Sequence, residues 1–311
     1  MITTITLNPA VDKTIEIDTF RIGSVNRISS SRVDAGGKGI NVSKVIQSLG
    51  GKSRAIGILA GKNGEFIKEY LDSIKIKNDF VFVEGETRIN TKVVDPVSHT
   101  NTDINEIGPM ISNENIDKLW NKFYESSDEN SIVVLSGSIP KNVDKSIYKT
   151  WIEKAKEKNI KTILDADGEL FKQGIKAAPY LVKPNIHELE GLFGQKIDSI
   201  EKAVKLSKEL LSQGVKIVVV SLGEDGALFV KKELVVLAKG IKVEVKSTVG
   251  AGDSMVAALA LAMDKGYDFE KAVRLAVACG TASVMTEGTQ AADIDTVMNL
   301  ENLVQFEYIN Y

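Results

Sequence analysis

The chain has 311 residues, of which 43% are hydrophobic and 26% are charged, and its formal net charge at pH 7 is −3. This composition is typical of a globular α/β enzyme, and the slightly acidic balance excludes the basic surface that nucleic-acid binding requires. One cysteine excludes an internal disulfide, and two histidines are too few for a His/Cys metal cluster.

The first residues form a strand-like run at 2–7, with no basic leader segment before it. No apolar stretch along the chain reaches the length that a membrane-spanning helix needs. We therefore expect a cytoplasmic protein with no membrane partner and no nucleic-acid partner.

Short β-branched runs alternate with amphipathic segments along most of the chain. The runs are 2–7, 55–59, 132–135, 161–164, 180–182 and 217–220. Apolar residues at helical spacing fill 42–49 and 200–211, and the small-residue segment 253–285 is broken only near Gly266. This alternation predicts an α/β fold with a mostly parallel sheet, helices on its faces and two closely packed buried helices near the end of the chain.

Two segments, 12–33 and 88–106, contain extended stretches without helices between them. We expect them to pair as a small sheet outside the main one. Neither a repeat of fixed period nor a Pro/Ser-rich linker is found, so this small sheet is an insertion in a single domain spanning 1–311.

Asp12 follows the first strand, in Asn8-Pro9-Ala10-Val11-Asp12. Ligand sites of open α/β sheets lie at the carboxyl ends of the strands, where a carboxylate can accept hydrogen bonds from sugar hydroxyls. Arg88 opens the second accessory segment and is suited to clamp a phosphate. An Asx-turn residue and a solvated strand-edge arginine are the alternatives.

The stretch Gly36-Gly37-Lys38-Gly39-Ile40-Asn41 places glycines and a lysine at the start of a helix. Helix N-termini bind anions, and a lysine adds a mobile point charge. This pattern predicts an anion-binding turn. A flexible turn followed by a helix remains the alternative.

Asn185 and Glu188 follow another strand, three residues apart, and so lie on one face if a helix begins there. An amide and a carboxylate in this arrangement suit a hydrated Mg²⁺, which retains most of its waters. The alternative is a capping pair at the helix start. The segment 221–226, after the next strand, is either a nucleotide-bordering loop or a plain tight turn.

The segment 247–256 carries Gly250 and Gly252 just before Asp253, at the start of a helix. Glycines allow the backbone to approach an anion closely, and the free N–H groups of the helix point at it. A carboxylate beside a phosphate site repels its ligand unless it acts as a base. Asp253 is therefore either a general base or a residue that stabilises the helix dipole.

In their order along the chain, these motifs resemble those of the PfkB, or ribokinase-like, family of sugar kinases. The resemblance rests on 36–41, 185–188 and 247–256, and it covers nearly the whole sequence. It implies a three-layer α/β/α core with a small β-sheet lid formed by about 12–33 and 88–106. Such lids often dimerise, so we expect a homodimer formed through the lid.

Four segments are similar to the phosphosugar branch of the family, and most similar to its kinases of fructose 1-phosphate. They are 8–12, 87–90, 102–105 and 136–140. The resemblance implies ATP-dependent phosphorylation of fructose 1-phosphate at its 6-hydroxyl. Tagatose 6-phosphate is the alternative substrate, and a sugar-phosphate sensor is the non-enzymatic alternative. A dinucleotide oxidoreductase is not favoured, because its third glycine would stand at Met255.

Carried over residue by residue, the resemblance implies Asp253 as general base and the amides of Gly250, Ala251 and Gly252 as an anion hole. The implied substrate-binding residues are Asp12, Gly37, Lys38, Asn41, Arg88, Asn90 and Ser138, with Lys38 and Arg88 as the candidates for the existing phosphate. The implied ATP-side residues are Lys183, Asn185, Ser221, Gly223, Gly226, Thr248, Thr286 and Gly288, and Glu188 would hold Mg²⁺ through water. Relatives with a monovalent-cation site carry Asn and Arg where this chain has Thr286 and Gln290, so potassium dependence is left open.

Overall fold

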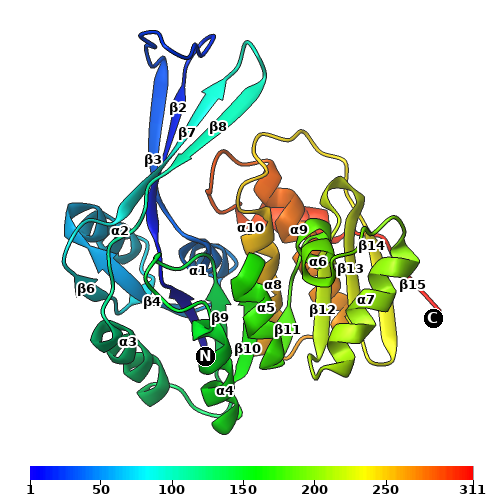
Figure 1. The fold of residues 1–311 in the computed structure, drawn as a ribbon. Helices are drawn as coiled ribbons and strands as arrows, with labels where there is room; N and C mark the ends of the chain where they lie inside the picture. Colours follow the sequence, from blue (N-terminus) through cyan, green and yellow to red (C-terminus); the bar gives the residue numbers. More distant parts are fainter. Residues whose placement is uncertain (311) are drawn as a thin grey trace.

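The structure is a computed structural model that describes residues 1–310. In this part of the chain, eleven strands form one main sheet with helices on both faces (Figure 1). Its strands are β1 (Ile2–Thr6), β4 (Ser53–Ala60), β5 (Lys77–Asn78), β6 (Val81–Val83), β9 (Ile132–Ser136), β10 (Lys161–Asp165), β11 (Leu181–Val182), β12 (Ile217–Ser221), β13 (Gly226–Lys231), β14 (Leu234–Lys239) and β15 (Phe306–Tyr308).

The main sheet has the order β15-β14-β13-β12-β11-β10-β9-β1-β4-β5, and β6 pairs with β4 beside β5. The strands from β5 to β12 are parallel, and β13 to β15 add an antiparallel edge. The central strands β1 and β9 are buried at every residue. A strand covered on both faces has a continuous run of apolar residues. For this reason the β-branched runs of the sequence predicted these strands.

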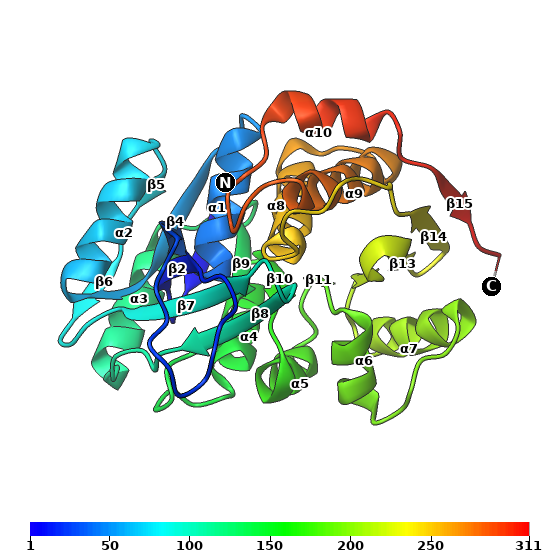
Figure 2. The same ribbon diagram turned by 90° about the horizontal axis from the view of Figure 1, so that it is seen from above.

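The helices cover the two faces of the main sheet, as Figure 2 shows from above. They are α1 (Lys38–Ser48), α2 (Gly61–Ser73), α3 (Asn113–Glu125), α4 (Ile147–Glu157), α5 (Gly168–Lys176), α6 (Ile186–Phe193), α7 (Ile200–Ser212), α8 (Ala251–Lys265), α9 (Phe269–Val284) and α10 (Ile294–Glu301). Helices α3 to α7 pack in one apolar core, and α1 packs with α8, α9 and α10 in another on the opposite face.

Helix starts follow their local sequence. Ser199, the residue before α7, accepts a hydrogen bond from the backbone N–H of Lys202, and Asp268 caps α9 in the same way through Lys271. Such side-chain caps satisfy N–H groups that the helix itself leaves free. The break between α8 and α9 is Gly266, which is left-handed at φ 66°.

A second, small sheet has the order β3-β2-β7-β8 and stands away from the main sheet (Figure 1). Its strands are β2 (Ala10–Glu16), β3 (Ser30–Gly36), β7 (Arg88–Asp95) and β8 (Thr100–Asn105). Strands β2 and β7 pair in parallel, so that Asp12 lies opposite Asn90. Because β3 ends at Gly36, the small sheet leads directly into the glycine turn before α1.

The predicted fold class, an α/β/α core with a mostly parallel sheet plus a small sheet, is confirmed. The small sheet takes its strands from the two predicted segments but begins earlier, at Ala10, and extends to Gly36. The antiparallel edge β13 to β15 was not predicted. Within residues 1–310, no helix combines the length and the apolar character needed to cross a membrane.

Candidate active site

A cavity of about 1410 Å³ lies between the small sheet and the carboxyl ends of the parallel strands. Most of the predicted site residues line it, although they come from segments spread from β2 to the loop after α9. They are Asp12, Gly37, Lys38, Asn41, Arg88, Asn90, Lys183, Asn185, Glu188, Ser221, Gly223, Gly226, Thr248, Gly250, Ala251, Gly252, Asp253 and Gly288. The folded chain therefore brings both predicted anion turns to one space.

The N-terminus of α8 opens into this cavity. Gly250 precedes it with φ 85°, a left-handed backbone that favours glycine, and no side chain caps the helix. The first N–H groups of a helix have no intrahelical acceptor, so those of 251–253 are available to an anion. A Cβ at Gly252 would lie 3.1 Å from Lys183 Nζ, which places a lysine ammonium beside these amides. This arrangement suits a phosphoryl group.

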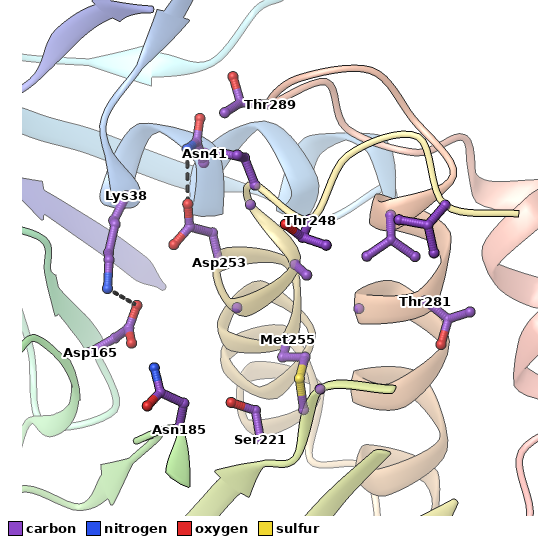
Figure 3. Close-up of a pocket in the computed structure, with 18 of the residues that line it drawn as sticks. Lys38, Asn41, Asp165, Asn185, Ser221, Thr248, Asp253, Met255, Thr281 and Thr289 are labelled. Carbon is purple, nitrogen blue, oxygen red and sulfur yellow. Dashed lines mark hydrogen bonds and ion pairs between the residues drawn. The ribbon is translucent and has the colours of Figure 1, made fainter. Parts of the chain in front are cut away.

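Asp253 is buried at 6% exposure in the first turn of α8. Its Oδ2 accepts a hydrogen bond of 2.8 Å from Asn41 Nδ2, and Figure 3 shows it between Asn41 and Lys38. Burial, together with the nearby Asp165 carboxylate, raises the pKa of Asp253 to about 6, against the opposing effects of Lys38, Asn41 and Lys183. A carboxylate with a pKa near the working pH is suited to general-base catalysis.

Asp165 is a site residue that the sequence reasoning missed. It ends β10 at 2% exposure, with its Oδ2 3.4 Å from Lys38 Nζ and its Oδ1 3.3 Å from Lys183 Nζ. Although burial opposes the effect, the two ammonium groups hold the pKa of Asp165 below 3.8, and Asp165 in turn raises the pKa of Lys38. Its position at the end of a parallel strand, the same signal that marked Asp12, could have identified it.

The cavity wall on the small sheet is polar. Asp12 Oδ1 accepts a 3.0 Å hydrogen bond from Asn90 Nδ2, and burial raises the pKa of Asp12. The Arg88 guanidinium donates from Nε and Nη2 to the backbone carbonyl of Asn8, at 3.3 and 3.1 Å. A side chain at Gly36 would collide with the Asp12 carboxylate, so this glycine keeps the carboxylate in place.

Lys38 and Arg88 have different partners. Lys38 pairs with Asp165 in the cavity, whereas Arg88 donates to the Asn8 carbonyl at the root of the small sheet. The two residues were predicted as candidates for the same phosphate of the substrate. The ion pair places Lys38 closer to the groups around Asp253, whose carboxylate also raises its pKa.

Asn185 and Glu188 form a complete capping box at the start of α6. Asn185 Oδ1 accepts from the Glu188 N–H at 2.8 Å, and Glu188 Oε2 accepts from the Asn185 N–H at 2.9 Å. The capping pair, which the sequence offered as the alternative to a magnesium site, is therefore formed. Both residues also line the cavity. Burial raises the pKa of Glu188, opposed by the hydrogen bond from Asn185.

Two predicted site residues lie outside the cavity wall. Ser138 Oγ accepts a 3.3 Å hydrogen bond from Asn8 Nδ2. Thr286 Oγ1 donates to the Ser283 carbonyl at 2.8 Å and lies 3.0 Å from the Gln290 carbonyl, so it closes the loop after α9. The structure gives both residues local hydrogen bonds, and their predicted contact with a ligand stays a prediction.

The remainder of the cavity suits a nucleotide. Met255 and Thr281 lie on α8 and α9 beyond Asp253, with Ser221 below them (Figure 3). Val277 and Val284 add apolar surface to this wall, and Gly280 leaves no room for a Cβ beside Met255. Within residues 1–310, no group of three or more His, Cys, Asp or Glu side chains could hold a bare metal ion. A Mg²⁺ ion that keeps its waters and is bound by one carboxylate and phosphates needs no such group.

An uncapped helix N-terminus, a buried carboxylate and two lysines meet at the carboxyl edge of a parallel sheet, and this arrangement is suited to phosphoryl transfer. The family model of the pfkB family carbohydrate kinases matches residues 3–296. The chain belongs to this family. It is an enzyme of the kinase class that transfers a phosphoryl group to a hydroxyl, and the family implies ATP as the donor.

Several relatives match over most of their length. The chain is 39% identical to the 1-phosphofructokinase of Bacillus subtilis (strain 168), over 92% of this chain and 93% of the relative. It is 38% identical to the 1-phosphofructokinase of Borreliella burgdorferi, over 92% of each chain. The crystal structure of phosphofructokinase-2 from Escherichia coli in complex with substrates and products is 30% identical, with a TM-score of 0.93 over 97% of this chain and 98% of that one.

Proposed function

We propose that this protein phosphorylates D-fructose 1-phosphate at its 6-hydroxyl with ATP, giving fructose 1,6-bisphosphate and ADP. The observation that carries the proposal is the buried Asp253 at the uncapped start of α8, beside Lys38 and Lys183. The 1-phosphofructokinase relatives support the choice of sugar phosphate.

In the proposed reaction, Asp253 accepts the proton of the 6-hydroxyl. The hydroxyl oxygen forms a bond to the γ-phosphorus while the bond from that phosphorus to the ADP oxygen breaks. The amides of 251–253 and the Lys183 ammonium stabilise the charge on the transferred group, which is the main catalytic need of phosphoryl transfer. The nearby Lys38 ammonium favours the charged form of Asp253, so it favours release of the proton that Asp253 accepts in the reaction.

The small sheet would bind the sugar. Asp12, Asn90 and Asn41 present hydrogen-bonding groups for the hydroxyls, and Arg88 is the candidate for the 1-phosphate. Arg32 on β3 reaches across to Glu287 in the loop after α9, at 2.9 Å, so the sheet already contacts the nucleotide side. Closure of the sheet as a lid would exclude water from the transferred phosphoryl group.

Mg²⁺ would be held by Glu188 through water, and it would supply charge neutralisation between the phosphates. The capping box fixes one oxygen of Glu188 at the helix start, which orients the carboxylate toward the cavity. A monovalent cation is not required by this proposal, because Thr286 and Gln290 stand where relatives with such a site carry other residues.

A substrate panel tests the proposal. ATP consumption is measured with fructose 1-phosphate, tagatose 6-phosphate or fructose 6-phosphate, and we expect the highest kcat/KM with fructose 1-phosphate. A higher value for tagatose 6-phosphate would identify the alternative kinase. Tight sugar-phosphate binding without sugar-dependent ATP consumption would instead identify a sensor.

We also propose that the small sheet pairs two copies of the chain. Apolar side chains on it and its loops are exposed, among them Ile22 at 94%, Val25 at 83% and Ile104 at 54%. Large apolar side chains exposed on an element that projects from the core are suited to burial against a second copy. Sedimentation analysis should show a dimer, and replacing Ile22 and Val25 by serine should shift it toward the monomer.

A further inference from the structure

Lys44 is a buried lysine that the proposed reaction does not use. It lies on α1 one turn after Asn41, with 5% exposure. Its Nζ donates to the Ala35 carbonyl at 3.0 Å, to Asn41 Oδ1 at 3.4 Å and to Thr289 Oγ1 at 3.5 Å. Among residues 1–310, no carboxylate lies within ion-pairing distance of it. An ammonium has three N–H groups, and here each has an oxygen acceptor.

The contact with Asn41 fixes which way that amide points. Asn41 donates from Nδ2 to Asp253 Oδ2 at 2.8 Å and accepts from Lys44 at Oδ1. A flipped amide would place its oxygen against the Asp253 carboxylate and its NH₂ group against the Lys44 ammonium. Both contacts would be repulsive, so the pair of charges on either side permits only one orientation.

We propose that Lys44 is a positioning residue, whose buried ammonium fixes the Asn41 amide so that Asn41 donates its hydrogen bond to Asp253. The inference rests on the proposed function, since it requires Asp253 to be the base. The same ammonium joins three parts of the site. Ala35 belongs to β3 at the root of the small sheet, Asn41 to α1, and Thr289 to the loop after α9 (Figure 3 shows Asn41, Asp253 and Thr289).

The electrostatic surroundings predict what loss of Lys44 would do. Lys44 faces Asp34 and Arg32 on β3, Asp12 on β2, Tyr70 on α2 and Asp253 on α8, and burial lowers its pKa. The groups around Asp253 are Lys38, Asp165 and Lys183, besides Asn41.

Without Lys44, Asn41 would be free to turn away from Asp253. The Asp253 carboxylate would lose both a donor and a nearby positive charge, and each loss raises its pKa. The acidic limb of the pH profile should therefore move to higher pH.

The test compares Lys44→Met, Lys44→Arg and the wild type. Lys44→Met should lower kcat about tenfold or more with little change in the KM for fructose 1-phosphate, as for other residues that orient a functional group. Its acidic limb should move up by about one pH unit from the wild-type value. Lys44→Arg keeps the charge and the donors, so it should restore the limb. Lys68→Met, an exposed change on α2, is the matched control and should leave the profile unchanged.

A lower melting temperature for Lys44→Met with an unchanged acidic limb and kcat would overturn the inference, because only a structural role would then remain. If Lys44→Met does not fold, Lys44→Gln supplies an uncharged side chain with a donor, and its limb should also move. Asp253→Asn is assayed in parallel. Loss of turnover in Asp253→Asn together with a normal Lys44→Met refutes the inference alone, whereas a wild type without sugar-dependent ATP consumption refutes the proposed function.

Discussion

Replacing Asp253 by asparagine should make the protein more stable while it loses activity. The carboxylate is almost fully buried, and an asparagine has nearly the same shape as the protonated acid. Loss of a general base typically lowers turnover by about 10²- to 10⁴-fold. Since Asn41 and the helix remain in place, binding of the sugar phosphate should change little.

The size of the gain follows from the raised pKa of Asp253. Its folded-state value is about 6, compared with 3.8 for an ordinary aspartate, so between these values the folded state binds more protons than the unfolded state. The wild type therefore loses stability as the pH rises through this window, and above it the charged carboxylate costs about 3 kcal/mol of folding free energy. Asparagine removes that cost. The difference should be largest at pH 8 and about half as large at pH 5.

Urea denaturation at pH 8 and pH 5 measures this difference, and a coupled ATP assay measures turnover. Asp117→Asn, on the exposed face of α3, is the matched control and should change neither quantity. Our reasoning would be refuted if Asp253→Asn were less stable than the wild type at pH 8, or if its gain did not depend on pH. Near-normal kcat in the variant would eliminate Asp253 as the base.

Three further changes probe other parts of the site. Glu188→Gln keeps an acceptor for the Asn185 N–H, so α6 should stay capped. The Mg²⁺ concentration for half-maximal rate should rise about tenfold. An unchanged Mg²⁺ titration would show that Glu188 does not take part in binding Mg²⁺. Arg88→Ala should raise the KM for fructose 1-phosphate about 10- to 100-fold and leave the KM for ATP nearly unchanged, and the reverse pattern would contradict our assignment. Gly250→Ala forces a side chain into a left-handed conformation at φ 85°. The added Cβ would meet Ser283 and Thr289 at ordinary contact distances of 3.8 and 3.9 Å, so the backbone strain alone should cost about 1–2 kcal/mol in thermal unfolding, with a lower kcat. A fully stable Gly250→Ala would show that this backbone strain is absent.

Much of the fold was predictable because parallel strands buried on both faces have a local signature. The β-branched runs at 132–135 and 217–220 match β9 and β12 almost residue for residue. The sequence also predicted that the two extended segments form a small sheet, but it did not predict which strands lie side by side. Strand β2 pairs with β7, more than seventy residues later, and only tertiary packing determines such a partner.

The site was predictable where glycine and a charged residue share a helix start. This signal located Lys38 and Asp253 in the same cavity. The pattern did not identify Asp165 or Lys44. An aspartate at a strand end and a lysine in a helix are common, and these two gain a role only through partners far away in the sequence. Thr286 was assigned by resemblance; in the structure its hydroxyl contacts backbone carbonyls of its own loop, and its contact with a nucleotide stays a prediction.

The position of Asp12 near the root of the small sheet has a mechanical consequence. With about 3.3 Å per residue, Asp12 lies roughly 7 Å along β2 from Ala10, whereas Glu16 lies roughly 20 Å away. If the sheet swings about its root, its far end travels about three times as far as Asp12. In the proposed reaction, the residues near the root would therefore stay beside the sugar, while the far end of the sheet opens and closes the cavity to water.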